Sequence, residues 1–226
     1  MKFEDRILYE DNHLIAVYKL NGEPVQSDET GDEPLIERVK EFIRKRDRKP
    51  GNVFLGLIHR LDRPTSGIVL FAKTSKALSR MNEQFRNRET GKLYYAVVEA
   101  MPPEEEGVLV GYLKKNAEKN KSFVFETQVK DSKRAELKYR LIGCSDRYYC
   151  VEIGLMTGRH HQIRAQFGHA GMPIRGDVKY GSKKALRDNS IMLHAGVLTF
   201  FHPVTKEKIV LKAKAPHDSL WTYFDI

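Results

Sequence analysis

A short polar segment between two apolar runs constrains the fold of this chain most strongly. The segment His59–Gly67 contains one acid, two arginines, one histidine and two hydroxyl side chains. The apolar runs Val53–Ile58 and Ile68–Phe71 flank it, and both have the length and composition of strands. Pro64 fixes the φ angle of the backbone, and Gly67 allows φ values that other residues avoid, so both are suited to a turn. The pattern predicts a polar loop held between two core strands, a common place for chemistry.

Strands are expected to dominate the rest of the chain. The apolar patterns predict two short strands within Ile7–Tyr18, short strands with charged turns over 108–142, and an alternating strand near 148–155. A final hairpin is expected from Ile191–Phe201 and Ile209–Leu211.

Three segments have helical periodicity. The first covers 34–46, with Pro34 in its first turn. The second begins after Ser75 as N-cap and ends at Gly91, and the third runs from about His160 to Ala170. We therefore predict an α+β fold with a mixed, mostly antiparallel central sheet and flanking helices, forming a single domain over residues 1–226.

The charge balance favours a polyanionic partner. The chain has 39 Lys+Arg against 30 Asp+Glu, a formal net charge of +9. Residues 73–92 carry six basic side chains against two acids, and residues 111–140 carry nine against four. A soluble basic protein without such a partner is the simpler alternative.

The two cysteines, Cys144 and Cys150, have neither the spacing of a zinc site nor a second pair to complete one. The eight histidines include no His-Glu-x-x-His pattern. We therefore expect no metal. The N-terminus shows no secretory signal and no apolar run is long enough to span a membrane, so a cytoplasmic protein without a membrane partner is expected.

Several motifs, in order along residues 7–211, resemble those of the RluA-type RNA pseudouridine synthases. His59–Gly67 is similar to the family's second motif, which implies that Asp62 is the nucleophile. Lys92–Ala96 resembles its Lys-x-Tyr-x-Ala motif, which implies an active-site tyrosine at Tyr94. Leu155–Arg164 resembles its Thr-Gly-Arg-x-His-Gln-Ile-Arg motif, which implies that Arg164 is the basic partner of the aspartate. The segments 7–22, 176–181 and 193–203 match further structural motifs.

The resemblance implies an isomerase that converts specific uridines of structured RNA to pseudouridine, by an aspartate-dependent mechanism on a flipped-out base. The reaction exchanges an N–C for a C–C bond without redox change, so no cofactor is expected. A buried carboxylate tends to protonate, and a permanently charged arginine opposes this. Tyr94 could stack on the uracil and move a proton. An ordinary buried ion pair and a core tyrosine are the structural alternatives for these residues.

Arg60 is expected to enter the RNA in place of the flipped base or to hold flanking phosphates, although a solvent-facing or Asp-paired arginine is equally compatible with the sequence. Further RNA or substrate contacts are expected from a small group of polar residues near the motifs: His59, Thr65, Ser66, Lys92 and Arg159.

The chain departs from the family pattern at four positions, which are Leu20, His160, Gln166 and Arg175. The first motif begins by residue 7, so no upstream accessory domain of the S4 type is expected. RNA selection would then rest on segments such as 34–49 and 111–140. The RNA could be ribosomal or transfer RNA, and we expect a monomer. The rival hypothesis is a catalytically silent RNA-binding protein with the same fold.

Overall fold

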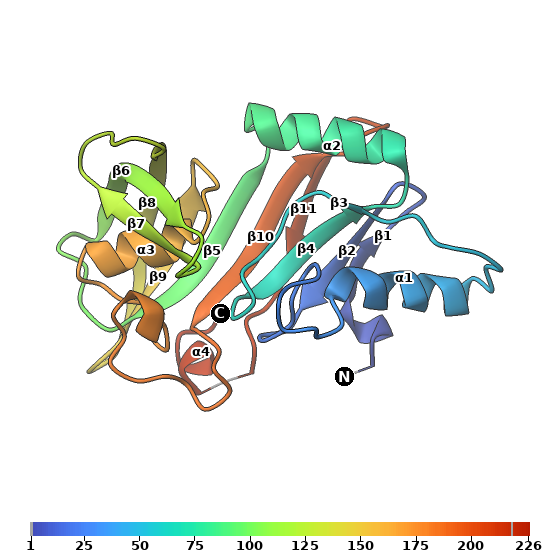
Figure 1. Cartoon of the computed structure of the whole chain (residues 1–226). Coiled ribbons are helices and arrows are strands. Elements are labelled where there is room, and N and C mark those ends of the chain that lie inside the picture. The colour runs from blue at the N-terminus through green and yellow to red at the C-terminus, as the bar shows by residue number, and fades with distance from the viewer. Residues whose placement is uncertain (1, 218) are drawn as a thin grey trace. The chain divides into compact units, whose positions relative to one another are not determined.

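The computed structural model describes residues 2–217 and 219–226, and the chain divides into two compact units (Figure 1). Unit 1 is Met1–Gly91 with Ala195–Pro216, and unit 2 is Lys92–His194 with His217–Ile226. The expectation of a single domain over 1–226 stays a prediction. Each unit has its own strands and its own helices.

The strands of unit 1 are neighbours in the order β1, β2, β4 and β10, with β3 beside β4 and β11 beside β10. Their bounds are β1 Ile7–Glu10, β2 Leu14–Lys19, β3 Gly56–Leu57, β4 Ser66–Ala72, β10 Leu193–Phe201 and β11 Lys208–Lys212. The first two residues of β10, Leu193 and His194, belong to unit 2. The pairs β1–β2, β2–β4, β3–β4 and β10–β11 are antiparallel. The two N-terminal strands and the C-terminal hairpin are thus confirmed.

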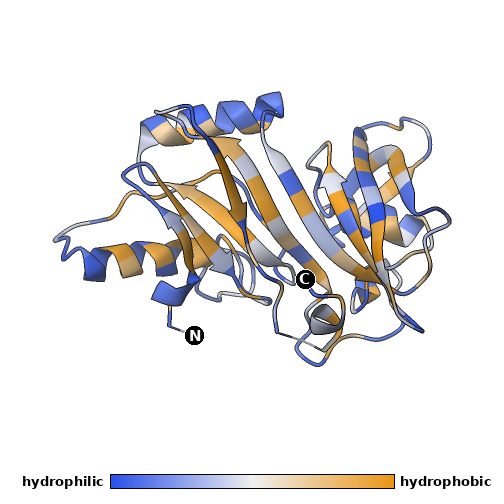
Figure 2. Cartoon of the chain, turned by 180° about the vertical axis from the view of Figure 1, so that it is seen from behind, coloured by the Kyte–Doolittle hydropathy of each residue, from blue (hydrophilic) through white to orange (hydrophobic). Residues whose placement is uncertain are grey.

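Both faces of the central strands of unit 1 are covered, which explains their continuous apolar sequences (Figure 2). Leu14 and Leu70 pack in one core with Met81 of α2 (Ser75–Asn87). Ile15, on the alternate face, is also fully buried. The helix α1 (Leu35–Arg46) lies along the same strands in Figure 1. The Asp62 loop therefore continues directly into a rigid core strand.

The strand expected before that loop is much shorter than its apolar sequence suggests. Only Gly56–Leu57 forms β3, which pairs with Ala72 and Phe71 at the far end of β4. β2 and β10 are the other neighbours of β4, so little of its edge remains for β3. Apolar composition could not reveal this competition for one strand edge.

Three helix boundaries in unit 1 differ from the prediction. The N-cap of α2 is Thr74, whose side chain accepts a hydrogen bond from the Ala77 amide at 3.2 Å, and Ser75 is the first helical residue. The helix ends at Asn87, with Arg88 in the left-handed region, and Gly91 belongs to the next strand. In α1, Pro34 is the N-cap. The two helix starts thus differ from the prediction by one residue each, whereas α2 ends before Arg88 and not at Gly91.

The strands of unit 2 are neighbours in the order β5, β9, β8, β6 and β7, and all these pairs are antiparallel. Their bounds are β5 Gly91–Val98, β6 Glu106–Asn116, β7 Lys121–Phe125, β8 Lys133–Cys144 and β9 Tyr149–Leu155. α3 (Gln162–His169) covers one face through Ala165, which packs with Leu113 and Ala135. The mixed, mostly antiparallel sheet with flanking helices is confirmed.

β6 and β8 are long strands, whereas short strands with charged turns were expected over 108–142. Exposed charges such as Lys138 and Arg140 alternate with buried residues along β8. In an antiparallel sheet with one solvated face, such charges belong to the strand itself and do not mark turns.

The third helix begins at Gln162, two residues later than expected, and Gly171 follows its end with a positive φ as expected. A last short helix, α4 (Ser219–Tyr223), places Trp221 against the His194 ring. The remaining elements are the 3₁₀ turns Glu4–Arg6 and Val178–Tyr180. Over the described residues, no helix has both the length and the apolar character needed to span a bilayer.

Candidate active site

The Asp62 loop of unit 1 is held by a buried lysine at the end of β2. Lys19 is fully buried, and its Nζ donates to the carbonyl oxygens of Leu20 at 3.0 Å, Arg63 at 2.9 Å and Thr65 at 2.6 Å. Burial lowers the pKa of Lys19 to about 7, while the charges of Glu23 and Asp62 oppose that shift. Lys19 thus fixes the backbone around Asp62 and attracts its carboxylate.

Backbone contacts complete the loop. The Gly22 amide donates to the Arg63 carbonyl at 2.9 Å, and the Thr65 amide donates to the Asp62 carbonyl at 3.0 Å. Gly67 has a φ of +123°, and a Cβ there would lie 2.3 Å from the Ala195 carbonyl oxygen. Only glycine fits this close approach, so the last residue of the motif is required by the fold.

Arg63 closes the other side of this loop. Its guanidinium donates to Thr30 Oγ1 at 2.5 Å, lies 3.4 Å from Asp28 and forms an ion pair with Asp32. These partners belong to the acidic segment 28–33, so the loop after β2 is fastened to the residue that follows Asp62.

The predicted RNA contacts in unit 1 have different environments. Arg60 is exposed. The His59 ring stacks on Phe85, and its Nε2 accepts the Leu70 amide at 3.1 Å, which gives it a structural role in the core. Ser66 is buried and hydrogen-bonds with Tyr18.

Thr65 differs from its neighbours because its buried Oγ1 has no hydrogen-bond partner among the described residues. Buried hydroxyls are rarely left unsatisfied in proteins. Thr65 therefore carries an unsatisfied polar atom three residues after Asp62.

Unit 2 places Arg164 in a cluster of side chains at the start of α3. Arg164 is 6% exposed, and its Nε and Nη2 donate to the two carboxylate oxygens of Asp177 at 2.6 and 2.9 Å. The guanidinium carbon lies 5.2 Å from the centre of the Tyr180 ring. This bidentate geometry fixes the plane of the guanidinium.

His161 supports the same cluster. It occupies the left-handed region, with φ of 52°, and its Nδ1 lies 2.9 Å from the Tyr180 hydroxyl. Burial, together with the nearby charge of Arg164, lowers the pKa of His161 to about 2. The ring is therefore neutral at physiological pH and adds no further positive charge beside Arg164.

Hydrogen bonds at the start of α3 explain why the motif Leu155–Arg164 contains Thr157 and Gln162. The Gln162 side chain accepts from the Thr157 hydroxyl at 2.8 Å and from the Arg159 amide at 2.9 Å, and donates to the Glu136 carbonyl at 3.0 Å. Thr157 and Gln162 thus tie the start of α3 to β8. The Arg159 side chain donates to the Arg134 carbonyl at 3.1 Å.

Tyr94 lies on β5, opposite Ile153 of β9, and is 9% exposed. Tyr95 pairs with Glu152 in the next register position, so it points to the other face of the sheet. Lys92 is half-buried two residues before Tyr94, on the same face, and burial lowers its pKa to about 8.

Asp62 belongs to unit 1, whereas Tyr94 and Arg164 belong to unit 2. Their association in one catalytic site stays a prediction. Three functional candidates were missed as individual residues, although their motifs were noted: Lys19, Asp177 and Tyr180. A lysine ending an apolar strand was the available signal for Lys19, and the segment 176–181 contains the other two.

Comparison with known proteins decides the family. The pattern of the RNA pseudouridylate synthase family matches residues 13–169 of this chain. The chain belongs to this family. As a pseudouridine synthase it is an isomerase that converts uridine in RNA to pseudouridine, and the rival hypothesis of a silent RNA-binding protein is not favoured.

Relatives of the family include enzymes named for two RNA classes. The ribosomal large subunit pseudouridine synthase C of Buchnera aphidicola (subsp. Baizongia pistaciae) is 34% identical over 93% of this chain and 67% of its own length. The tRNA pseudouridine synthase C of Vibrio parahaemolyticus is 32% identical over 96% of this chain and 92% of its own length.

A solved structure supports the fold. Human RNA pseudouridylate synthase domain containing 4 superposes with a TM-score of 0.82 at 21% identity, covering 98% of this chain and 92% of that chain. At this identity the likeness concerns the fold alone.

Proposed function

We propose that Asp62 is the catalytic carboxylate of this pseudouridine synthase. The observation that carries the proposal is the anchoring of its loop by the buried Lys19, which binds the backbone on both sides of Pro64 and attracts the Asp62 charge. A catalytic group must be held in place before substrate arrives, and a loop tied to a buried cation meets that need. Asp62 acts at the sugar C1′ or at the ring C6 of the target uridine.

Arg164 is proposed to be the basic partner of Asp62 when the RNA is bound. Asp177 and Tyr180 fix its guanidinium within unit 2. A permanently charged group in a buried position stabilises an ionised carboxylate brought to it, because low polarity strengthens their attraction.

Tyr94 is proposed to stack on the flipped uracil and to move a proton after the base has rearranged. Its nearly buried ring and its hydroxyl provide both functions. Tyr95, on the opposite face of β5, serves as the matched control position for this proposal.

Arg60, which is exposed beside the catalytic loop, is proposed to occupy the place of the flipped base or to hold its neighbouring phosphates. Thr65 is proposed to offer its unsatisfied hydroxyl to the substrate. We further propose that Ser66 and His59 shape the Asp62 loop where it contacts the substrate, and that Lys92 and Arg159 bind phosphates.

The RNA substrate is proposed to be ribosomal or transfer RNA, since relatives named for each class are similar over nearly the whole chain. We also propose that the protein is a cytoplasmic monomer. It is proposed to work without a cofactor, because the reaction gains no atom and has no redox step. Sedimentation of the purified protein would test the monomer.

The experiment measures tritium released from RNA transcribed with uridine labelled at C5, using separate ribosomal and transfer RNA pools. The new C–C bond replaces the C5 hydrogen, so turnover releases tritium to water. We expect release by the wild type from one pool, none by Asp62→Asn, and nearly wild-type release by the control Tyr95→Phe. Equal release by Asp62→Asn and the wild type would refute the assignment of Asp62.

A further inference from the structure

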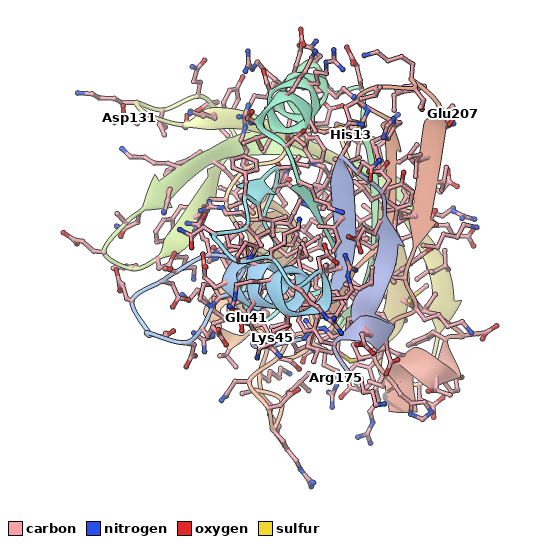
Figure 3. The ribbon with its side chains drawn as sticks, turned by 90° about the vertical axis from the view of Figure 1, so that its right-hand side faces the viewer. His13, Glu41, Lys45, Asp131, Arg175 and Glu207 are labelled. Carbon is pink, nitrogen blue, oxygen red and sulfur yellow. The ribbon has the colours of Figure 1, made fainter. Side chains whose placement is uncertain are left out.

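The β6–β7 hairpin of unit 2 carries an unneutralised positive charge. Residues 114–121 contain four lysines and one glutamate. Lys114 lies 3.9 Å from Asp131, which projects from the loop between β7 and β8 (Figure 3). Five further basic side chains near the hairpin form no ion pair within the described part of the chain: Lys115, Lys119, Lys121, Arg159 and Lys179. We call these five residues the hairpin surface.

Neighbouring side chains hold the hairpin in one position. The His160 ring places Nδ1 3.0 Å from Ser122 Oγ and Nε2 3.1 Å from Asn120 Oδ1, and Ser122 Oγ donates to the His160 carbonyl at 2.7 Å. Lys179 Nζ donates to the Asn120 carbonyl at 3.1 Å. His160 and Lys179 therefore both contact Asn120 at the tip of the hairpin.

The base of the hairpin is joined to the Arg164 cluster. The Ser122 amide donates to the Tyr180 hydroxyl at 2.8 Å, and Lys121 Nζ lies 5.0 Å from the Tyr180 ring centre. The same ring contacts Arg164 and the same hydroxyl contacts His161. A ligand on the hairpin surface would thus bind beside the group proposed to face Asp62.

The five like charges around the hairpin repel one another, and a polyanion removes that repulsion. A nucleic-acid backbone fits because its phosphates are evenly spaced and need cations rather than a shaped pocket. Phe123, 40% exposed and 5.8 Å from Lys121 Nζ, adds an aromatic face on which a base can stack.

We propose that the hairpin surface binds phosphates of the substrate RNA, and that His160 is the positioning residue that holds the hairpin for this purpose. The inference rests on the proposed function, since it assigns an RNA-binding surface to the same enzyme. His160 touches no reacting atom, so it should govern RNA affinity and leave the chemical step alone.

The first test removes two charges with Lys115→Gln and Lys119→Gln together. Fluorescence anisotropy with a labelled stem–loop RNA gives Kd over a series of salt concentrations. We expect the log–log salt slope to fall by about 1.4 and Kd at 0.1 M salt to rise roughly ten- to thirtyfold, because each single-strand phosphate contact contributes a slope of about 0.7. At saturating RNA, kcat should stay unchanged.

The matched control is the pair Lys208→Gln and Lys212→Gln, which removes the same charge from exposed positions of β11 in unit 1. It should leave the salt slope within error of the wild type. If the hairpin pair and the control pair gave the same slope and the same Kd, the hairpin surface would be rejected as an RNA site.

The second test concerns His160. His160→Ala should raise KM for RNA about tenfold at unchanged kcat, and should speed hydrogen exchange at the Ser122 amide. His160→Gln, which can still donate to Asn120, should recover part of both effects. A change in kcat alone, or no faster exchange at Ser122, would overturn the positioning role.

These tests separate the two proposals. Tritium release by the wild type together with an unaltered salt slope of the hairpin pair would sink the hairpin surface and leave the enzyme assignment intact. If instead RNA binding depended on the hairpin but the wild type released no tritium from either RNA pool, the hairpin surface would stand and the proposed catalytic function would fail.

Discussion

Each unit has a buried basic side chain beside a residue proposed for catalysis, Lys19 in unit 1 and Arg164 in unit 2, and the two are held by different groups. In unit 1, Lys19 binds three backbone carbonyls and has only electrostatic attraction to Glu23 and Asp62. In unit 2, Arg164 binds both oxygens of the Asp177 carboxylate and lies against the Tyr180 ring. The lysine therefore fixes main chain, whereas the arginine is itself fixed by side chains.

This difference suits the residues that each cation serves. A loop has no regular hydrogen bonds of its own, so a point charge with several donors can replace them for the Asp62 loop. A planar guanidinium needs a carboxylate that sets its orientation, and Asp177 does this for Arg164. The two regions should consequently fail in different ways when their anchors are removed.

The largest effect is expected from Asp177→Ala. The substitution leaves the Arg164 charge buried without its bidentate partner, and breaking a buried pair from one side costs about 3–5 kcal/mol. Urea denaturation would measure this loss in the free energy of unfolding. A loss below about 1 kcal/mol would mean that other contacts of Arg164 hold the cluster.

Lys19→Met should cost less, about 2–3 kcal/mol. The three carbonyls lose a donor, which costs roughly 1–3 kcal/mol for a buried group. The Arg63 carbonyl keeps the Gly22 amide, and the desolvation of the ammonium is relieved. We expect turnover to fall further than stability explains, because the Asp62 loop loosens. Wild-type kcat in the folded Lys19→Met protein would contradict the anchoring of that loop.

The two regions also differ in the pH range where a buried base affects stability. The folded protein keeps His161 neutral down to a pKa of about 2, whereas the unfolded chain binds a proton near pH 6.5. Falling pH therefore favours the unfolded state, by about 2 kcal/mol between pH 7 and pH 5. The lowered pKa of Lys19, about 7 against 10.5, has the same sign in a higher range: stability should rise with pH between about 7 and 10.5.

His161→Asn tests whether His161 causes the loss of stability in acid. Asparagine is chosen because it tolerates the left-handed backbone at this position. The wild type should lose about 2 kcal/mol relative to the variant on going from pH 7 to pH 5. Denaturation curves at both pH values give the comparison. Parallel losses in the two proteins would show that His161 does not carry the acid sensitivity.

The sequence predicted what depends on local pattern. The Asp62 loop, the strand after it and the order of motifs followed from apolar runs and from short polar motifs. Anchors that join distant segments were not predictable in this way: Lys19 reaches residues 63 and 65, and Arg164 reaches Asp177. The N-cap at Thr74 was missed because Thr74 and Ser75 are both good caps, and only the Ala77 contact separates them.

Arg63→Gln is expected to have the smallest effect on stability. It tests whether an exposed ion pair contributes less than the buried Lys19 and Arg164 do. Arg63, like Arg164, pairs with carboxylates, but its partners Asp28 and Asp32 are exposed. Exposed ion pairs contribute about 0–1 kcal/mol, because water screens them and long side chains lose freedom. Urea denaturation at low and high salt should therefore show a loss below about 1 kcal/mol that shrinks with salt. A salt-insensitive loss as large as that of Asp177→Ala would mean that the acidic segment 28–33 supports the Asp62 loop as firmly as Lys19 does, and that the backbone anchoring in unit 1 does not rest on one buried cation.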